Sequence, residues 1–174
     1  NISITNSGTI TATTDNSGLN ISSSDGTVVT NTGTISGVDH GMQSSNVDNS
    51  TITNHGTISA SSNSGYGLLY ENDGTNRVNN TLNNYGTISA TSGSFADGIG
   101  IGRGASPMFN ITINNYGTIS GSDDSIKMLN SSNTGINIVT KDEGTYVGEI
   151  NLNDSSTTMT LDCSISKDQK IEIH

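Results

Sequence analysis

The sequence is poor in most of the residues that build a compact globular core. Its 174 residues include no tryptophan, one cysteine (Cys163) and one proline (Pro107), and only 4% are aromatic and 29% hydrophobic. A lone cysteine excludes an internal disulfide framework. No apolar run is long enough for a transmembrane helix and no signal peptide is recognised, so targeting must be inferred from other features.

Positive charge is scarce as well. Six Lys and Arg residues stand against sixteen Asp and Glu residues, which gives a formal net charge of −10. Affinity for nucleic acid comes mainly from the neutralisation of phosphates by cationic side chains. Nucleic acid is therefore excluded as an expected partner, and an anionic membrane surface is disfavoured for the same reason.

What the chain has in abundance is one repeated phrase, Asn-x-Gly-Thr-Ile-Ser/Thr-Ala/Gly. Copies begin at Asn6, Asn31, Asn54, Asn84 and Asn115, and a degenerate sixth copy, DEGTYVG, begins at Asp142. Successive copies are separated by 23 to 31 residues without any helical apolar spacing. A period of this size predicts a solenoid, which needs only a thin core one coil wide.

Alternation within each repeat predicts three short strands per coil: the phrase, a strand after a Gly- or Asp-containing turn, and a strand that leads back into the next phrase. In the phrase, one parity should point inward. It holds Ile10, Ile35, Ile58, Ile88, Ile119 and Tyr146, followed by Ala12, Gly37, Ala60, Ala90, Gly121 and Gly148. The third strand should likewise bury Ile2, Ile4, Val29, Ile52, Val78, Leu82, Ile111, Ile113, Ile136 and Ile138.

The predicted fold is an all-β, single-stranded parallel β-helix of about six to seven coils. Residues 1–142 would form the repeated coils, and residues 143–174 would form degenerate C-terminal coils of the same domain. The turns after the second strand lengthen in the middle coils, at residues 71–77 and 102–107. Loops on one side of a solenoid tolerate insertion, so these turns are expected to carry contacts.

The pattern I-x-N-x-G-T-I-S-G/A, followed by a Gly-Ile turn, resembles the passenger domains of bacterial autotransporters over residues 1–161. The segment Gly144–Asp162 is similar to the part of such passengers that precedes the translocating barrel. The resemblance implies a right-handed β-helix displayed on the bacterial surface, in a parent protein that carries an outer-membrane β-barrel. It also implies a stalk or adhesin that contacts itself or a protein or glycan of another cell, and a stable C-terminal folding core for secretion.

The Asn of the phrase is expected to form a structural ladder at a corner of the solenoid, because stacked amides can satisfy one another along the axis. Its members are Asn6, Asn31, Asn54, Asn84 and Asn115, ending at Asp142. The following glycines are expected to adopt positive φ angles. These are Gly8, Gly33, Gly56, Gly86 and Gly117.

Two outward columns are candidate contact surfaces. The first is an outward Thr ladder, which could match an ice lattice or be ordinary strand surface. Its members are Thr9, Thr34, Thr57, Thr87 and Thr118. The second comprises His55, Tyr85 and Tyr116, which could contact a glycan or protein or could stiffen the face by stacking.

Asp123 and Asp124 are the strongest candidates for catalysis. Polysaccharide-acting β-helix hydrolases and lyases use similar paired carboxylates as acid and base. The other candidate carboxylate, Asp73, lies close to two coils away. Asp39, Asp97 and Asp124 occupy equivalent turn positions in their coils, and a repeated Asp at a turn favours turn formation. No catalytic residue is therefore assigned, and the hydrolase remains an alternative.

No metal site or cofactor is expected from the sequence. His40, His55 and His174 are scattered, and no Cys or His spacing matches a zinc site.

Overall fold

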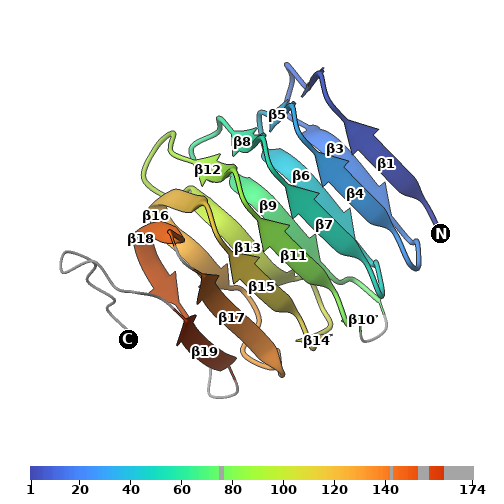
Figure 1. Cartoon of the computed structure of the whole chain (residues 1–174), viewed down its shortest axis with the longest axis vertical. Helices are drawn as coiled ribbons and strands as arrows, with labels where there is room; N and C mark the ends of the chain where they lie inside the picture. The colour runs from blue at the N-terminus through green and yellow to red at the C-terminus, as the bar shows by residue number, and fades with distance from the viewer. Residues whose placement is uncertain (75–76, 142, 153–156, 163–174) are drawn as a thin grey trace.

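The chain folds as a parallel β-solenoid of about six turns, which confirms the predicted fold class (Figure 1). The computed structural model describes residues 1–74, 77–141, 143–152 and 157–162. Asp142, Cys163 and His174 lie outside the described residues. The part of the chain that the structure describes contains no helix, and thus none that could cross a lipid bilayer.

One side of the solenoid is a sheet of seven parallel strands, made from the strand that leads into each phrase. In spatial order these are β1 (Ser3–Asn6), β4 (Val28–Asn31), β7 (Thr51–Asn54), β11 (Thr81–Asn84), β15 (Thr112–Asn115), β17 (Ile136–Lys141) and β19 (Thr157–Asp162). Each strand pairs only with the corresponding strand of the coil before or after it. The sequence period is therefore also the stacking period.

The phrase strands and the flanking strands form the other two sides. The phrase strands are β2 (Thr9–Thr11), β5 (Thr34–Gly37), β8 (Thr57–Ala60), β12 (Thr87–Ala90), β16 (Thr118–Met128) and β18 (Thr145–Asn151). The flanking strands are β3 (Ser17–Ser22), β6 (His40–Ser45), β9 (Tyr66–Glu71) and β13 (Asp97–Arg103). β16 turns the corner without a break and pairs with both β12 and β13, so the two sides are assigned to one sheet.

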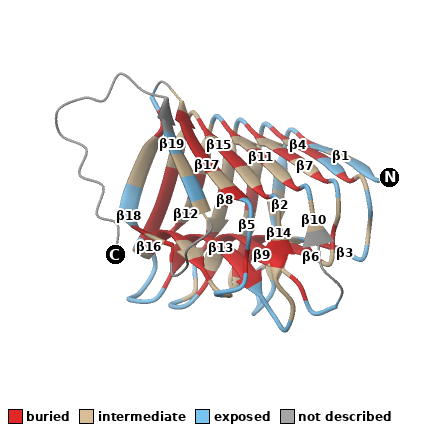
Figure 2. Cartoon of the chain, turned by 90° about the horizontal axis from the view of Figure 1, so that it is seen from below, coloured by how far each residue is buried: buried red, intermediate tan, exposed pale blue. Residues whose placement is uncertain are grey.

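The core is a column of aliphatic side chains inside the coils. Ile35, Ile58, Ile88 and Ile119 are fully buried and stack in register, as the alternation predicts. Figure 2 shows buried residues along the strands and exposed ones in the turns. Such apolar burial is the main stabilising contribution, at about 25 cal/mol per Å² removed from water.

The end coils depart from the predicted pattern. Ile2 is 45% exposed and lies outside β1, and Gly148 is exposed with φ +102° instead of pointing inward. The pairing of β16 with β18 shifts register between Ser120 and Asp124, because the last coil turns this corner with fewer residues. In the middle coils, Val78 belongs to an additional short pair, β10 (Arg77–Val78) with β14 (Met108–Phe109), instead of β11.

The phrase glycines are required for a different reason from the predicted one. Their φ angles are not positive, so the expectation for Gly8, Gly33, Gly56, Gly86 and Gly117 was wrong. A Cβ added to Gly86 would lie 2.1 Å from the carbonyl oxygen of Gly56 in the preceding coil. At Gly33, Gly56, Gly86 and Gly117 glycine is needed because the preceding coil approaches too closely for any side chain, whereas nothing lies within 4 Å of a Cβ added to Gly8 in the first coil.

A second corner, before the seven-stranded sheet, does use positive φ angles. Asn49, Asn79 and Asn110 have φ angles of 51°, 59° and 54°. Asn79 Nδ2 donates to Asn49 Oδ1 at 3.1 Å, and Asn110 Nδ2 donates to Asn79 Oδ1 at 3.3 Å. This exposed amide column was not predicted, although the sequence places an Asn two residues before each of β7, β11 and β15. Asn tolerates the left-handed region better than other non-glycine residues.

Candidate functional site

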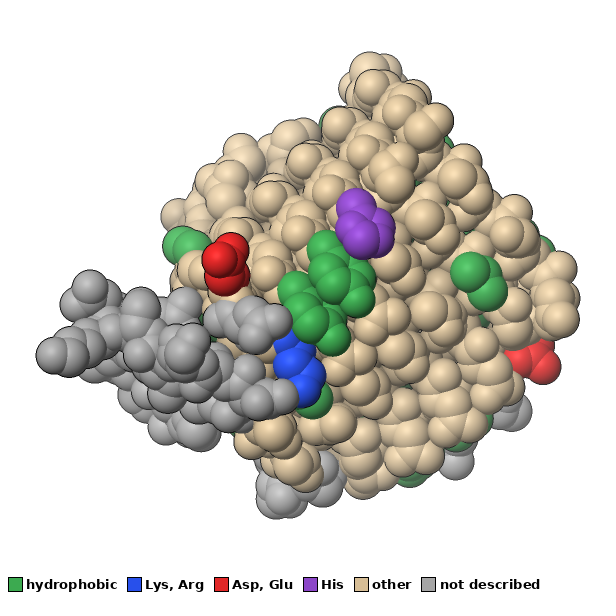
Figure 3. All heavy atoms as spheres, viewed as in Figure 1, with side chains coloured by type: hydrophobic (Ala, Val, Ile, Leu, Met, Phe, Trp, Pro, Cys, Tyr) green, Lys and Arg blue, Asp and Glu red, His purple; other side chains and the backbone are tan. Residues whose placement is uncertain are grey.

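One side of the solenoid surface is a flank without charged residues, which we call the uncharged flank. It consists of residues 3–11, 28–37, 51–60, 81–90 and 112–121, none of which is Asp, Glu, Lys or Arg. These segments run from the seven-stranded sheet through the phrase corner into the phrase strands, in register across five coils. Figure 3 shows the sheet side of this flank as a largely polar, uncharged surface.

The Asn ladder lies beneath the phrase corner. Asn31, Asn54, Asn84 and Asn115 are fully buried, and Asn6 is 7% exposed. Each Nδ2 donates to the Oδ1 of the Asn in the next coil, at 2.8, 2.8, 2.9 and 2.9 Å from Asn6 to Asn84. Each of these four Nδ2 atoms also donates to two backbone carbonyls, such as Gly86 O at 3.3 Å and Thr118 O at 3.1 Å for Asn84. This accounts for the Asn side chains as structural elements.

The strand register continues the column to Thr140, and the predicted last member, Asp142, lies outside the described residues. The strand register pairs Asn115 with Thr140, because the last coil inserts extra residues between this position and the phrase Thr. Thr140 is buried, and its Oγ1 donates to Tyr146 Oη at 3.3 Å. A hydroxyl pair thus stands at the position where the next amide would lie.

The Thr ladder forms a regular column on the phrase strands. Thr9, Thr34, Thr57, Thr87 and Thr118 are paired in register. Thr9 is exposed, while the other four are half-buried. The seven-stranded sheet carries a comparable set of outward residues that was not predicted as a site, including Thr30, Thr53, Asn83 and Asn114 in one in-register column.

The three aromatic candidates form one stack at the phrase corner. His55 and Tyr85 have ring centroids 4.6 Å apart at 6°, and Tyr85 and Tyr116 have centroids 4.5 Å apart at 13°. Both faces of the Tyr85 ring are therefore covered by neighbouring rings, although the residue is 46% exposed. A sugar ring packs on an open aromatic face, so this stack offers edges and hydroxyl groups instead of a platform.

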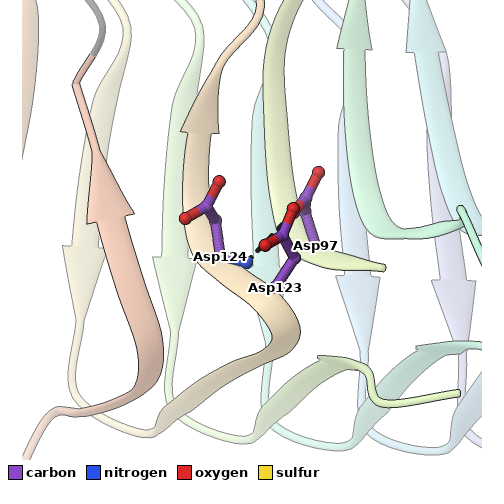
Figure 4. Close-up of side chains that lie close together, drawn as sticks. All are labelled: Asp97, Asp123 and Asp124. Atoms are coloured by element: carbon purple, nitrogen blue, oxygen red, sulfur yellow. Dashed lines mark hydrogen bonds between the residues drawn. The ribbon is translucent and has the colours of Figure 1, made fainter. Parts of the chain in front are cut away.

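The opposite side, which we call the charged flank, comprises β3, β6, β9, β13 and residues 123–129. Here Asp97, Asp123 and Asp124 bring carboxylate oxygens within 4.8 Å of one another (Figure 4). Lys127 Nζ lies 2.9 Å from Asp123 Oδ2, 3.0 Å from Asp124 Oδ2 and 3.7 Å from Asp97 Oδ1. The lysine ammonium thus already supplies the cation that this acidic cluster requires.

Two groups of this cluster, Asp97 and Lys127, have shifted pKa values. Asp97 is 1% exposed and Asp124 is 3% exposed, so the two carboxyl groups are closed to a bulky substrate. Burial raises the pKa of Asp97 to about 6, against the lowering effects of the Asp124 backbone N–H and of Lys127. Burial disfavours the charged form of Lys127, but hydrogen bonds to Asp123 and Asp124 outweigh it and raise the pKa of the ammonium.

The predicted equivalence of Asp39 with Asp97 and Asp124 was wrong. The register pairs His40 with Tyr66 and Tyr66 with Asp97, so Asp39 lies one position earlier in its coil. Asp97 and Asp124 do correspond, and Asp124 N donates to Asp97 Oδ1 at 3.1 Å. The sequence pattern predicted the wrong alignment for Asp39 because the turns before these strands differ in length.

Beside the acidic cluster, the charged flank holds a cleft of about 670 Å³ that the sequence did not reveal. It is lined by Asp39, His40, Gln43, Ser64, Tyr66, Glu71, Arg103, Gly104 and Leu129. Arg103 and Gly104 come from the lengthened turn at residues 102–107. That turn was predicted to carry contacts.

No protein-family model, no curated protein and no solved structure matches this chain. The class of protein defined by the fold is a parallel β-solenoid with one uncharged flank and one charged flank.

Proposed function

We propose that this chain is a β-helical stalk and adhesin segment of an autotransporter passenger, and that its rods associate side by side through the uncharged flank. The observation that carries the proposal is this flank: five coils in register present Ser, Thr and Asn without a charged residue, in a protein of net charge −10.

Electrostatics explains why this flank would be the contact. Copies of an acidic rod repel one another, and the repulsion is weakest where both surfaces lack charge. Hydroxyl and amide groups at regular spacing can then form hydrogen bonds between rods, as Asn114 Nδ2 does with Asn83 Oδ1 at 2.9 Å within one rod. The alternative occupants of the flank are a protein or a glycan on another cell.

Association of the purified chain tests the self-contact. We expect association, measured by light scattering and sedimentation, to increase from about 10 to 150 mM salt as the net charge is screened. A Thr53→Glu and Asn83→Glu double variant should reduce association at least about tenfold, because like charges would face each other. An Asn20→Glu and Ser22→Glu double variant, at two exposed positions of β3 on the charged flank, adds the same charge and is the matched control. Equal effects of the two changes would contradict the proposal.

Surface display is tested separately in the parent protein. A downstream β-barrel in the parent gene would support the autotransporter assignment, and its absence would contradict it. With a barrel present, deletion from Glu143 onward should impair display more than deletion of residues 31–53, one early repeat. Equal display of both deletions would count against a C-terminal folding core.

The in-register Thr ladder supports ice binding as a second candidate function. Parallel strands place successive Thr side chains about 4.8 Å apart along the rod. If ice is the ligand, the protein should shape ice crystals and Thr87→Tyr should abolish the effect. Unshaped crystals with the wild-type protein would exclude it.

A further inference from the structure

The cleft on the charged flank has one carboxylate, Glu71, with one oxygen that is held by two hydrogen bonds and another that accepts none from the described residues. Glu71 Oε2 accepts hydrogen bonds from Gln43 Nε2 at 2.6 Å and from Ser45 Oγ at 2.9 Å. Glu71 Oε1 lies 3.8 Å from Arg103 Nε, which is within ion-pair distance but too long for a hydrogen bond. An oriented acceptor beside a cationic donor is suited to two neighbouring hydroxyl groups.

The Gln43 side chain is fixed in turn by two further donors. Ser17 Oγ and Asn20 Nδ2 donate to Gln43 Oε1 at 3.1 and 3.2 Å. The polar wall of the cleft is therefore connected over successive coils before any ligand binds. Such preorganisation lowers the entropic cost of binding.

An apolar wall faces these polar groups. Tyr66 is half-buried, and its ring lies against the backbone of β13 at Gly100. A Cβ at Gly100 would lie 2.6 Å from two Tyr66 ring carbons and 3.0 Å from Leu129 Cδ1. The absence of a side chain at residue 100 thus makes room for an aromatic and an aliphatic group at the edge of the cleft. Small-ligand sites combine such apolar surface with a few placed polar groups.

The cleft also contains a buried polar atom without a partner. His40 is 7% exposed, its ring centroid lies 5.4 Å from that of Tyr66, and its Nδ1 makes no hydrogen bond with the described residues. Burial, followed by the neighbouring Arg103, lowers the pKa of His40, so the ring is neutral at pH 7. The neutral ring therefore adds no charge to the cleft, and its unpaired nitrogen is closed to solvent.

Charge selects the class of ligand. Asp39 and Glu71 outnumber Arg103 among the lining residues, and the cluster of Asp97, Asp123, Asp124 and Lys127 adds further negative charge nearby. Phosphate, sulfate and carboxylate ligands would be repelled. The volume of about 670 Å³ lies within the roughly 300–1,000 Å³ of small-molecule sites.

We propose that this cleft binds a neutral oligosaccharide, with Tyr66 and Leu129 packing against a sugar ring and with Glu71 and Arg103 hydrogen-bonding to its hydroxyl groups. The site lies on the flank opposite the proposed self-contact and is independent of it. It would give a rod bundle a second, sugar-directed contact through residues that the bundle leaves exposed.

Titration of the full chain with defined trisaccharides tests the site. Cellotriose, maltotriose and triacetylchitotriose serve as neutral probes, and 3′-sialyllactose serves as the anionic comparison, with binding followed by calorimetry and NMR shifts. We expect at least one neutral probe to bind with a Kd of about 1 mM or tighter, and the anionic probe to bind at least about tenfold more weakly. Arg103→Ala and Tyr66→Ala should each weaken binding about tenfold or more.

The controls separate this site from other surfaces and from misfolding. Arg103 is 53% exposed, so its truncation should leave the melting temperature unchanged. Tyr85→Ala, in the aromatic stack of the uncharged flank, should not change sugar affinity. The proposal is overturned if no neutral probe binds, if Arg103→Ala binds as well as wild type, or if Tyr85→Ala removes binding. Light scattering of the same variants reports self-association independently, so either proposal can fail alone.

Discussion

The uncharged flank and the charged flank are built on the same coils but obey different constraints. Along the uncharged flank the strands pair in register through five coils, whereas the pairing on the charged flank shifts register between Ile101 and Arg103. The first flank repeats its residues because close stacking fixes the backbone there. The second varies because loops of different length enter it, and variable loops are where solenoids carry specific contacts. In this protein, residues that repeat in every coil hold the coils together, and residues that differ between coils form the candidate binding site.

The comparison is tested most strongly at the phrase glycines. Gly86→Ala should lower the free energy of unfolding by about 3 kcal/mol or more, because the new Cβ would overlap the carbonyl oxygen of Gly56. Gly8→Ala is the matched control, since nothing lies within 4 Å of its added Cβ, and it should change stability by less than about 0.5 kcal/mol. Urea unfolding measures both variants. Similar losses would mean that coil contact does not explain these glycines.

The Asn ladder gives the next largest effect. Asn84→Ala should destabilise by about 2–3 kcal/mol, because it removes the acceptor of Asn54 Nδ2 and three bonds donated by a buried amide. Asn114→Ala breaks an amide pair on the half-exposed face of the neighbouring strand and should cost about 0.5 kcal/mol. Equal losses in urea unfolding would show that burial does not distinguish the two amide columns.

On the charged flank, in contrast, one substitution is expected to raise the free energy of unfolding instead of lowering it. The pKa of Asp97 is raised from 3.8 to about 6, so its folded carboxyl binds a proton more readily than the unfolded one. The buried charge therefore destabilises the fold above pH 6, and this cost is relieved as pH falls from 6 to 4. Asp97→Asn should raise the free energy of unfolding by about 2 kcal/mol at pH 8 and by almost nothing at pH 4.

Unfolding of the Asp97 variant at the two pH values measures this difference. Asp15→Asn, at an exposed position, is the control and should change stability at neither pH. A loss of stability for Asp97→Asn at pH 8 would mean that the contact with Lys127, at 3.7 Å, outweighs the burial of the carboxylate.

The smallest expected effect concerns the aromatic stack. Tyr85→Ala removes a ring between two others and should destabilise by about 1 kcal/mol. Thr32→Ala, in the same column one coil before His55, should have less than half that effect. Thermal unfolding measures both variants. Unchanged stability of Tyr85→Ala would indicate that the stack serves as a contact surface and does not stiffen the fold.

Much of the fold could be predicted because the apolar alternation within each repeat indicates a strand and its inward face. The parity of Ile58 and Ile88 gave their burial directly, and the stacking of successive coils followed from the recurrence of Asn54 and Asn84. Positive φ angles were wrongly predicted for the phrase glycines because a sequence pattern shows that a side chain is excluded, but not whether φ or a neighbouring coil excludes it. The corner at Asn79 was overlooked because the residues around it differ between coils.

The cleft could not be predicted for a different reason. Tyr66, Glu71 and Arg103 do not recur in the repeat, and they meet only because β9 and β13 stack with a register shift near Arg103. The turns before these strands have unequal lengths, so counting along the sequence misplaced Asp39 as well. Side-chain proximity on this flank depends on where each loop ends.

The sequence by itself determined the solenoid, its inward aliphatic column and its ladder of amides, because each of these follows from a period and an alternation that every coil repeats. Only the tertiary structure decided which carboxylates share Lys127, which ring faces are covered, and that a polar cleft lies opposite the uncharged flank. The physical reason is that strand alternation is local, whereas contacts between unequal turns arise only when the coils are stacked.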